Sequence, residues 1–150
     1  MGNYLVSLMS KMTGLNAYSL TEGMIGFFGW LNVLLAMIAV SVFTLRRVNK
    51  RFYANKHALI KNLLKPLAKF HPYVGGALLF FGYLHGDLAL PRSVFRAHTG
   101  PLIWWILLAM LLVATLGKKY KLKNWLVIHR ALAGTCVVAI FLHLFFRNLL

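Results

Sequence analysis

The stretch NWLVIHRALAGTCVVAIFLHLFFRNLL, residues 124–150, decides the fold class. Its apolar run from about 125 to 146 is long enough to cross a bilayer as one helix, which takes about 20 residues. Two histidines, His129 and His143, interrupt this run. An imidazole is costly to bury in hydrocarbon unless a partner occupies it, so the two rings call for a ligand or for hydrogen-bond partners.

The rest of the chain shares this apolar character. Of the 150 residues, 60% are hydrophobic, and the mean hydropathy is +0.71, which is too high for an ordinary soluble domain. We therefore predict a single integral membrane domain over residues 1–150. The lone cysteine, Cys136, excludes an intrachain disulfide. No removable signal peptide is expected, because the first residues lack a basic n-region and a cleavage site.

Four apolar segments predict an all-α bundle of four transmembrane helices. They cover about 24–45, 70–88, 100–116 and 125–146. The second segment is the least certain from hydropathy, since it contains two histidines and four glycines. Residues 57–70, HALIKNLLKPLAKF, have apolar residues at helical spacing and lysines elsewhere, which predicts a short helix along the inner membrane interface. The first 20 residues predict a similar interfacial helix on the outer side.

The basic residues lie between the spans. The chain has 17 Lys and Arg against two acids, a net charge of +15. Because the cations avoid the apolar runs, membrane topology explains them and no nucleic-acid partner is expected. The positive-inside rule places both basic loops in the cytoplasm and both termini outside the cytoplasmic membrane. The twelve loop cations are Arg46, Arg47, Lys50, Arg51, Lys56, Lys61, Lys65, Lys69, Lys118, Lys119, Lys121 and Lys123.

The second span repeats the histidine spacing of the fourth. His71 and His85 are fourteen residues apart, as are His129 and His143. Fourteen residues return a helix to nearly the same face, about 21 Å further along its axis. The second and fourth spans run in parallel, so His71 lies level with His129 on the inner side, and His85 level with His143 on the outer side. Two imidazoles at each of two levels suit bis-histidine ligation of two stacked b-type haems.

Histidines inside a span have other common roles besides haem ligation. A lone intramembrane histidine is often a proton-relay member or a hydrogen-bonded packing residue, but two equal pairs at matching depths favour haem. A zinc, copper or non-haem iron site is disfavoured, because its ligands usually lie a few residues apart. No CxxCH motif occurs, so haem would be held without thioether bonds. Arginines near the span ends are candidates for pairing with haem propionates, or else for interfacial anchors: Arg92, Arg96, Arg130 and Arg147.

Five glycines in the second and fourth spans remove side chains where a macrocycle would approach the backbone. Ordinary helix packing by small residues explains them about as well. They are Gly75, Gly76, Gly82, Gly86 and Gly134.

The segment WLVIHRALAGTCVVAIFLH, residues 125–143, resembles the last haem-ligand helix of the ferric reductase-like transmembrane domains. In that family a Trp and then an apolar-His-Arg step precede a second His. The segment HTGPLIWWILLAMLLVAT, residues 98–115, is similar to the family's intervening helix. The resemblance covers roughly residues 70–147. It implies that His71, His85, His129 and His143 bind two haems and that electrons cross the membrane, as in other di-haem membrane cytochromes b.

These observations predict a transmembrane electron carrier that serves as the membrane subunit of an oxidoreductase complex, with no catalytic residue of its own. Unlike NADPH oxidases and metalloreductases, these 150 residues contain no flavin or nucleotide domain, so electrons are expected from another polypeptide. A flavin or iron–sulfur subunit, or an acidic carrier, would dock on the basic inner surface, which also suits anionic lipid. Two alternatives stay open: a quinone-reactive subunit with an outer site near Asp87 and His98, and a haem-free membrane anchor for a soluble enzyme.

Overall fold

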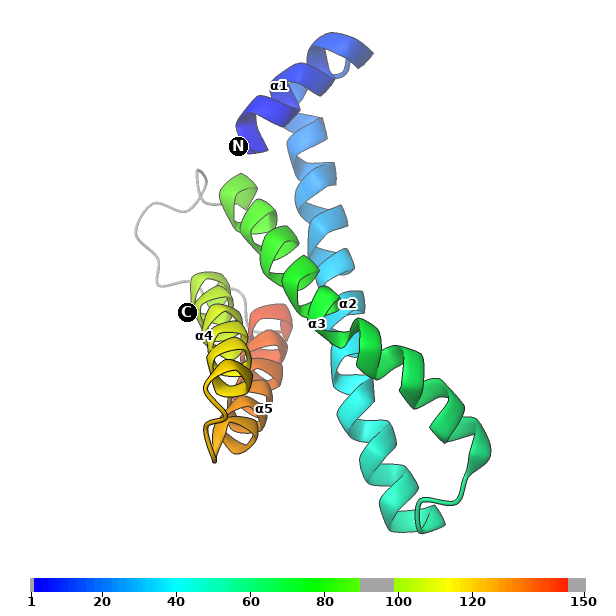
Figure 1. Cartoon of the computed structure of the whole chain (residues 1–150). Coiled ribbons are helices and arrows are strands. Elements are labelled where there is room, and N and C mark those ends of the chain that lie inside the picture. The colour runs from blue at the N-terminus through cyan, green and yellow to red at the C-terminus, as the bar shows by residue number, and fades with distance from the viewer. Residues whose placement is uncertain (1, 90–98, 146–150) are drawn as a thin grey trace.

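The computed structural model describes residues 2–89 and 99–145, and the regular structure within them is helical. This confirms the predicted all-α class. Figure 1 shows α2 and α3 as a long hairpin, α4 and α5 as a shorter hairpin beside it, and α1 folded back at the far end of α2. The helices are α1 (Gly2–Thr13), α2 (Ala17–Tyr53), α3 (Ala58–Ala89), α4 (Thr99–Lys119) and α5 (Trp125–Phe145).

Three helices, α2, α4 and α5, are long and apolar enough to cross a membrane. They contain the predicted spans 24–45 and 100–116 and, up to Phe145, the predicted span 125–146. The predicted span 70–88 is helical too, but it forms part of α3, which is not one of the three. Its histidines, its glycines and Asp87 lower its hydropathy. Three apolar helices of spanning length within residues 2–89 and 99–145 are therefore consistent with a membrane protein.

Many large apolar side chains of these helices are exposed on the surface of the protein. Phe27 is 64% exposed, Trp30 72% and Trp105 62%. Few hydrophobic side chains of the described residues are buried, and three of them, Leu78, Leu84 and Leu88, belong to α3. A soluble monomer rarely exposes apolar patches of this extent to water, whereas a surface that faces the hydrocarbon of a bilayer is normally apolar.

Helix α2 is longer than the span predicted within it. Its 37 residues make it about 55 Å long, whereas the hydrocarbon core of a bilayer is about 30 Å thick. At its start, the side chain of Asn16 accepts a hydrogen bond of 2.8 Å from the Tyr18 N–H. At its end, Ala54 adopts the left-handed conformation and its N–H donates to the Asn49 carbonyl. The helix therefore extends past the predicted span 24–45 at both ends, up to a capping residue on each side.

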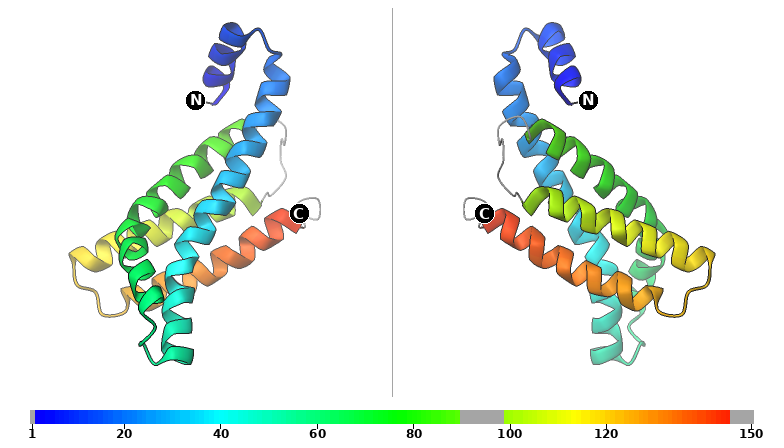
Figure 2. Two further views of the ribbon diagram at one scale, coloured as in Figure 1. Left: turned by 90° about the vertical axis from the view of Figure 1, so that its right-hand side faces the viewer. Right: turned by 90° about the vertical axis from the view of Figure 1, so that its left-hand side faces the viewer.

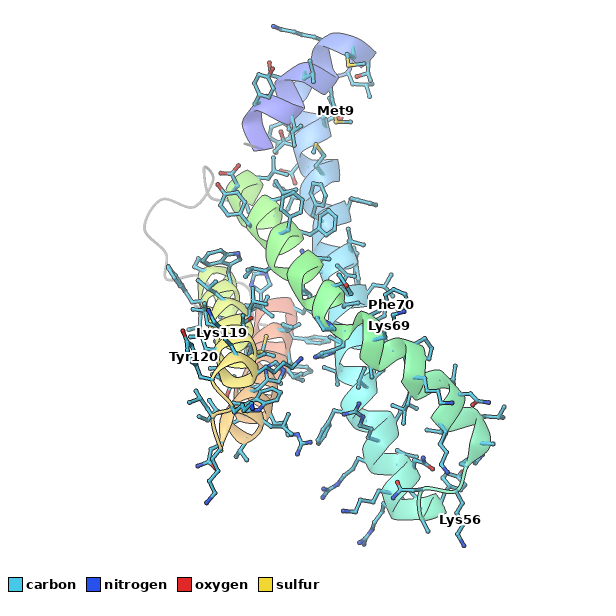
Figure 3. All side chains as sticks on the ribbon, in the orientation of Figure 1. Met9, Lys56, Lys69, Phe70, Lys119 and Tyr120 are labelled. Atoms are coloured by element: carbon cyan, nitrogen blue, oxygen red, sulfur yellow. The ribbon has the colours of Figure 1, made fainter. Side chains whose placement is uncertain are left out.

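The predicted interfacial segment 57–70 is not a separate helix, because α3 begins at Ala58 and runs on to Ala89. Pro66 and Pro72 lie inside α3. A proline within a helix removes one backbone hydrogen bond and crowds the preceding turn. Figure 3 shows the resulting bend next to Lys69 and Phe70. The bend separates the lysine-bearing first half of α3 from the half that carries His71 and His85.

Helices α4 and α5 have 21 residues each, about 31 Å, which matches the thickness of a bilayer core. The turn between them is closed by the Leu122 N–H, which donates to the Gly117 carbonyl over 3.0 Å. A Cβ atom on Gly117 would collide with the side chain of Trp125. Glycine is therefore what allows α5 to begin so close to α4.

The two hairpins meet mainly through α3 and α4, where the indole N–H of Trp104 donates to the Leu79 carbonyl over 3.2 Å. Contacts within each hairpin are far more extensive, and α3 and α5 share no extensive helix–helix contact. Figure 2 shows the second half of α3 inclined in the same sense as α4 and α5, while α2 crosses them.

Candidate functional site

Four histidines from α3 and α5 meet in two pairs. The rings of His71 and His129 have centres 6.2 Å apart and planes inclined at 76°. The rings of His85 and His143 have centres 6.3 Å apart and planes inclined at 85°. We call the first the inner pair and the second the outer pair, after the predicted topology. All four side chains are partly buried. The spacing predicts these two combinations, while metal ligation by them remains a prediction.

The separation of the rings has the size that a shared metal ion requires. A metal ion lies about 2.0–2.1 Å from an imidazole nitrogen, and that nitrogen lies about 1.1 Å from its ring centre, so two opposed ligand rings have centres about 6.3 Å apart. Edge-to-face contact between two rings covers the same range, about 4.5–7 Å, so distance alone does not choose between them. The hydrogen bonds on the far side of the rings add a second criterion.

Backbone carbonyls hold the Nδ1 atoms of two of the rings. Nδ1 of His85 lies 3.0 Å from the Ile25 carbonyl of α2, and Nδ1 of His129 lies 3.2 Å from the Met110 carbonyl of α4. A carbonyl only accepts, so Nδ1 must donate in both rings, which leaves Nε2 of the neutral imidazole with a free lone pair. Histidines that bind metal through one nitrogen commonly donate from the other in this way.

The other two rings are backed differently. Nδ1 of His143 lies 2.8 Å from the hydroxyl of Thr99, the first residue of α4. Nδ1 of His71 is buried without a hydrogen bond of good geometry, although the Ala39 backbone of α2 lies close enough to interact with it. The groups that interact with Nδ1 of the α3 histidines thus come from α2, and those that interact with Nδ1 of the α5 histidines come from α4. The sequence gives no signal for these partners, because they come from other helices.

The glycines near the histidines fall into two groups. A Cβ on Gly82 would meet Trp104 at 3.7 Å, so Gly82 serves ordinary helix packing. The other four predicted positions have no neighbouring side chain within 4 Å of such a Cβ: Gly75, Gly76, Gly86 and Gly134. Gly29 of α2 also borders a histidine, since a Cβ there would lie 3.2 Å from Cε1 of His85, a contact that the sequence did not predict.

Basic side chains gather around the inner pair. Arg46 at the end of the predicted first span and Lys118 at the end of α4 are close enough to His71 to act on it electrostatically. The guanidinium of Arg130 lies over the ring of Phe43, 5.8 Å from its centre. The sequence assigns Arg46 and Lys118 to membrane topology and to the docking surface, and not to the histidines. Arg147, like Arg92 and Arg96, lies outside the described residues.

Asp87, which the quinone alternative invokes, holds α1 in place. Its carboxylate accepts a hydrogen bond of 2.6 Å from the Gly2 N–H. Leu88 beside it is 1% exposed, and a Cβ on Gly2 would lie 2.6 Å from its side chain. Asp87 therefore takes part in the packing of α1 on α3, and its predicted neighbour His98 lies outside the described residues.

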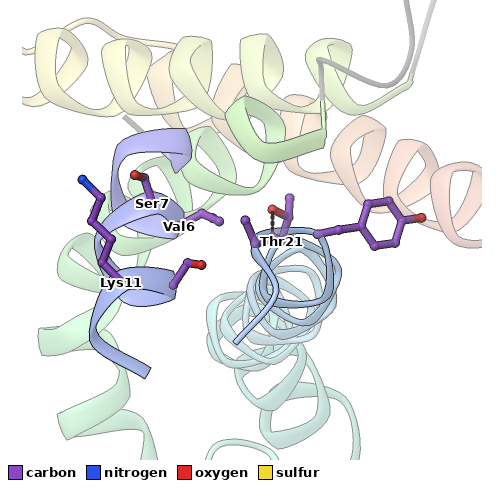
Figure 4. A pocket seen from close by; sticks show the side chains of 7 residues that line it. Val6, Ser7, Lys11 and Thr21 are labelled. Atoms are coloured by element: carbon purple, nitrogen blue, oxygen red, sulfur yellow. Dashed lines mark hydrogen bonds between the residues drawn. The ribbon is translucent and has the colours of Figure 1, made fainter. Parts of the chain in front are cut away.

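Two open pockets lie between α1 and α2, away from the histidines. The first, of about 420 Å³, is the one in Figure 4, where Val6 of α1 points towards Thr21 of α2. The second, of about 440 Å³, has an apolar lining that includes Met24, Phe27 and Phe28. Neither is lined by any of the four histidines, so the candidate chemistry lies at the ring pairs and not in these pockets.

Each ring pair offers two protein ligands. Across residues 2–89 and 99–145, no three His, Cys, Asp or Glu side chains come together as a metal-binding group. A metal ion held by a pair would thus need its remaining ligands from elsewhere, as a porphyrin supplies them. Comparison with protein-family models, with curated proteins and with solved structures gave no significant match.

Proposed function

We propose that this chain is a membrane electron carrier that holds two b-type haems, one between His71 and His129 and one between His85 and His143. The observation that carries the proposal is that the rings of each pair have centres 6.2 or 6.3 Å apart while one ring of each pair donates from Nδ1 to a backbone carbonyl, which leaves its Nε2 free to bind a metal ion. A haem supplies four equatorial nitrogens and an iron that changes oxidation state by one electron, so each pair would complete six-coordination.

The chain's own residues would orient and tune the ligands. The carbonyls of Ile25 and Met110 accept from Nδ1 of His85 and His129, which fixes the ring orientation and keeps Nε2 unprotonated. Such bonds also make the ligands more basic, which affects the redox potential. With two histidines holding each haem, no position on the iron would be left for a substrate. This arrangement suits electron transfer better than catalysis at the metal.

The two levels would carry electrons across the membrane. Fourteen helical residues separate them by about 21 Å, most of the thickness of the hydrocarbon core. We infer that the second half of α3 is a fourth span, because ligation would remove the cost of placing its two histidines in lipid. The positive-inside rule then gives a four-helix bundle in the cytoplasmic membrane, with both termini outside.

Electrons would enter from a separate subunit at the basic, cytoplasmic end. Lys118 lies at the end of α4 and also acts on His71, so the cationic surface reaches the inner pair. An acidic flavin or iron–sulfur protein would be steered to this surface.

Haem content tests the proposal. The protein is produced in haem-replete cells, purified in mild detergent, and assayed by a reduced-minus-oxidised spectrum and pyridine haemochrome quantification. We expect about two haem b per chain, one for each pair. A matched control is His57→Ala, since His57 lies beside Tyr53 at the tip of the α2–α3 hairpin and in neither pair. Purified, folded protein without a haem spectrum would refute the proposal and leave the histidines as a packing contact.

A further inference from the structure

The outer pair has a hydrogen-bond partner that a substitution can remove. Both rings of this pair have a partner at Nδ1, the Ile25 carbonyl for His85 and the Thr99 hydroxyl for His143. Met110 backs the inner ring of His129 with its carbonyl, which no substitution at that position deletes. Thr99 is therefore the one described Nδ1 partner that belongs to a side chain.

The Thr99 contact is short and lies in a confined place. Its hydroxyl oxygen is 2.8 Å from Nδ1 of His143, and a Cβ on the next residue, Gly100, would lie 3.5 Å from Cε1 of the same ring. Both residues belong to the first turn of α4, so they approach the ring together. A hydroxyl both donates and accepts, and as an acceptor from Nδ1–H it leaves Nε2 free.

Gly29 leaves space beside the ring of His85. A Cβ there would lie 3.2 Å from Cε1 and 3.6 Å from Nδ1 of His85, so alanine would push the ring by a few tenths of an ångström. That push is directed at the edge of the ring that reaches the Ile25 carbonyl. No such contact exists for the glycines at 75 and 76, which have open space beside them.

We propose that Thr99 and Gly29 are the positioning residues of the outer pair. Thr99 sets the orientation and basicity of His143, and Gly29 leaves the space in which His85 reaches its backbone partner. This inference rests on the proposed haem ligation. It predicts that the affinity and the potential of the outer haem depend on these two side-chain positions, whereas the inner haem does not depend on them.

The direction of the effect follows from the hydrogen bond. Without an acceptor at Nδ1, His143 becomes a weaker electron donor through Nε2, so the oxidised iron is stabilised less and the potential of the outer haem rises. Loss of an outer-shell partner of this kind typically weakens metal binding about 10- to 100-fold.

The test compares Thr99→Val, which removes the hydroxyl at nearly constant shape, with Thr99→Ser, which keeps it. Thr115→Val is the matched control, since Thr115 also lies in α4 but bonds to the Leu111 carbonyl of its own helix. Each substitution is made in the full chain and in a His71→Ala background, which isolates the outer haem. The readouts are a redox titration and the rate of haem transfer to an apo-globin acceptor.

We expect Thr99→Val to raise the potential of the outer haem and speed its loss about 10- to 100-fold. Thr99→Ser and Thr115→Val should behave as wild type, and Gly29→Ala should also loosen the outer haem. An unchanged outer haem in Thr99→Val, or an equal change in the inner haem, would overturn this inference while two haems in the wild type would still support the proposed function. A wild type without haem would instead refute the proposed function itself.

Discussion

Replacing any one of the four histidines by alanine should remove one haem and spare the other. The two levels lie about 21 Å apart along each helix, well beyond the distance of about 7–10 Å within which substitutions influence each other. The haem-to-chain ratio should therefore fall from about two to about one in every single variant, because each haem has its own axial pair. The double variant His71→Ala/His129→Ala should also retain about one haem, since both residues serve the same pair.

The spectra of the remaining haem carry the sharper test. The variants His71→Ala and His129→Ala should leave the same residual spectrum and the same potential, because both retain the intact outer pair. His85→Ala and His143→Ala should share a different residual spectrum. A glycine variant, His129→Gly, removes the whole ring from a position where its centre lies 6.2 Å from that of His71. Added imidazole should enter that space and restore the second haem.

The assay is the pyridine haemochrome ratio together with a redox titration of each purified variant, and His57→Ala serves as the unpaired control. The pairing would be refuted if the residual haem of His71→Ala had the spectrum and potential of that in His85→Ala rather than of that in His129→Ala. Each haem would then be bound by two histidines of one helix and not by one from each of two helices. Two haems retained in His129→Ala would refute the assignment of that ligand.

Three further predictions concern other parts of the chain. Neutralising the lysines of the α4–α5 turn to Gln should slow reduction by an acidic donor severalfold at low salt and leave it unchanged at high salt; equal rates at low salt would favour lipid as their partner. The lysines are Lys119, Lys121 and Lys123, without Lys118, which acts on His71. Gly117→Ala should lower the stability in detergent by about 1–3 kcal/mol, because its Cβ collides with Trp125; in thermal unfolding, Gly23→Ala, which meets nothing within 4 Å, should have no such cost. Cys136 is 4% exposed, so Cys136→Leu should overpack α5 and lower the stability in detergent by about 1–3 kcal/mol, whereas Val137→Leu, at a position that is 46% exposed, should not; an equal cost for both would contradict the packing of α5.

Local patterns in the sequence determined the helical class, the apolar segments and the two fourteen-residue histidine spacings. Each depends only on hydropathy over one helix length and on the constant geometry of the helix. That geometry also explains why His71 and His85 lie on one face of α3, and why His129 and His143 lie on one face of α5. Hydropathy identifies the second span less clearly than the others, because the histidines and glycines that suit a ligand site also lower the mean hydropathy of the segment.

Tertiary structure decided what the sequence could not, because it depends on how helices pack and rotate against one another. The lysine-bearing segment and the histidine-bearing segment form one continuous helix, α3, which bends near its two prolines. Packing brought the Ile25 and Met110 carbonyls, the Thr99 hydroxyl and Gly29 against the rings, and it turned Asp87 towards α1. Hydrogen bonds such as these change by whole ångströms when a helix turns by a few tens of degrees. A linear spacing can therefore predict which histidines face each other, but only the packed helices determine what holds each ring in place.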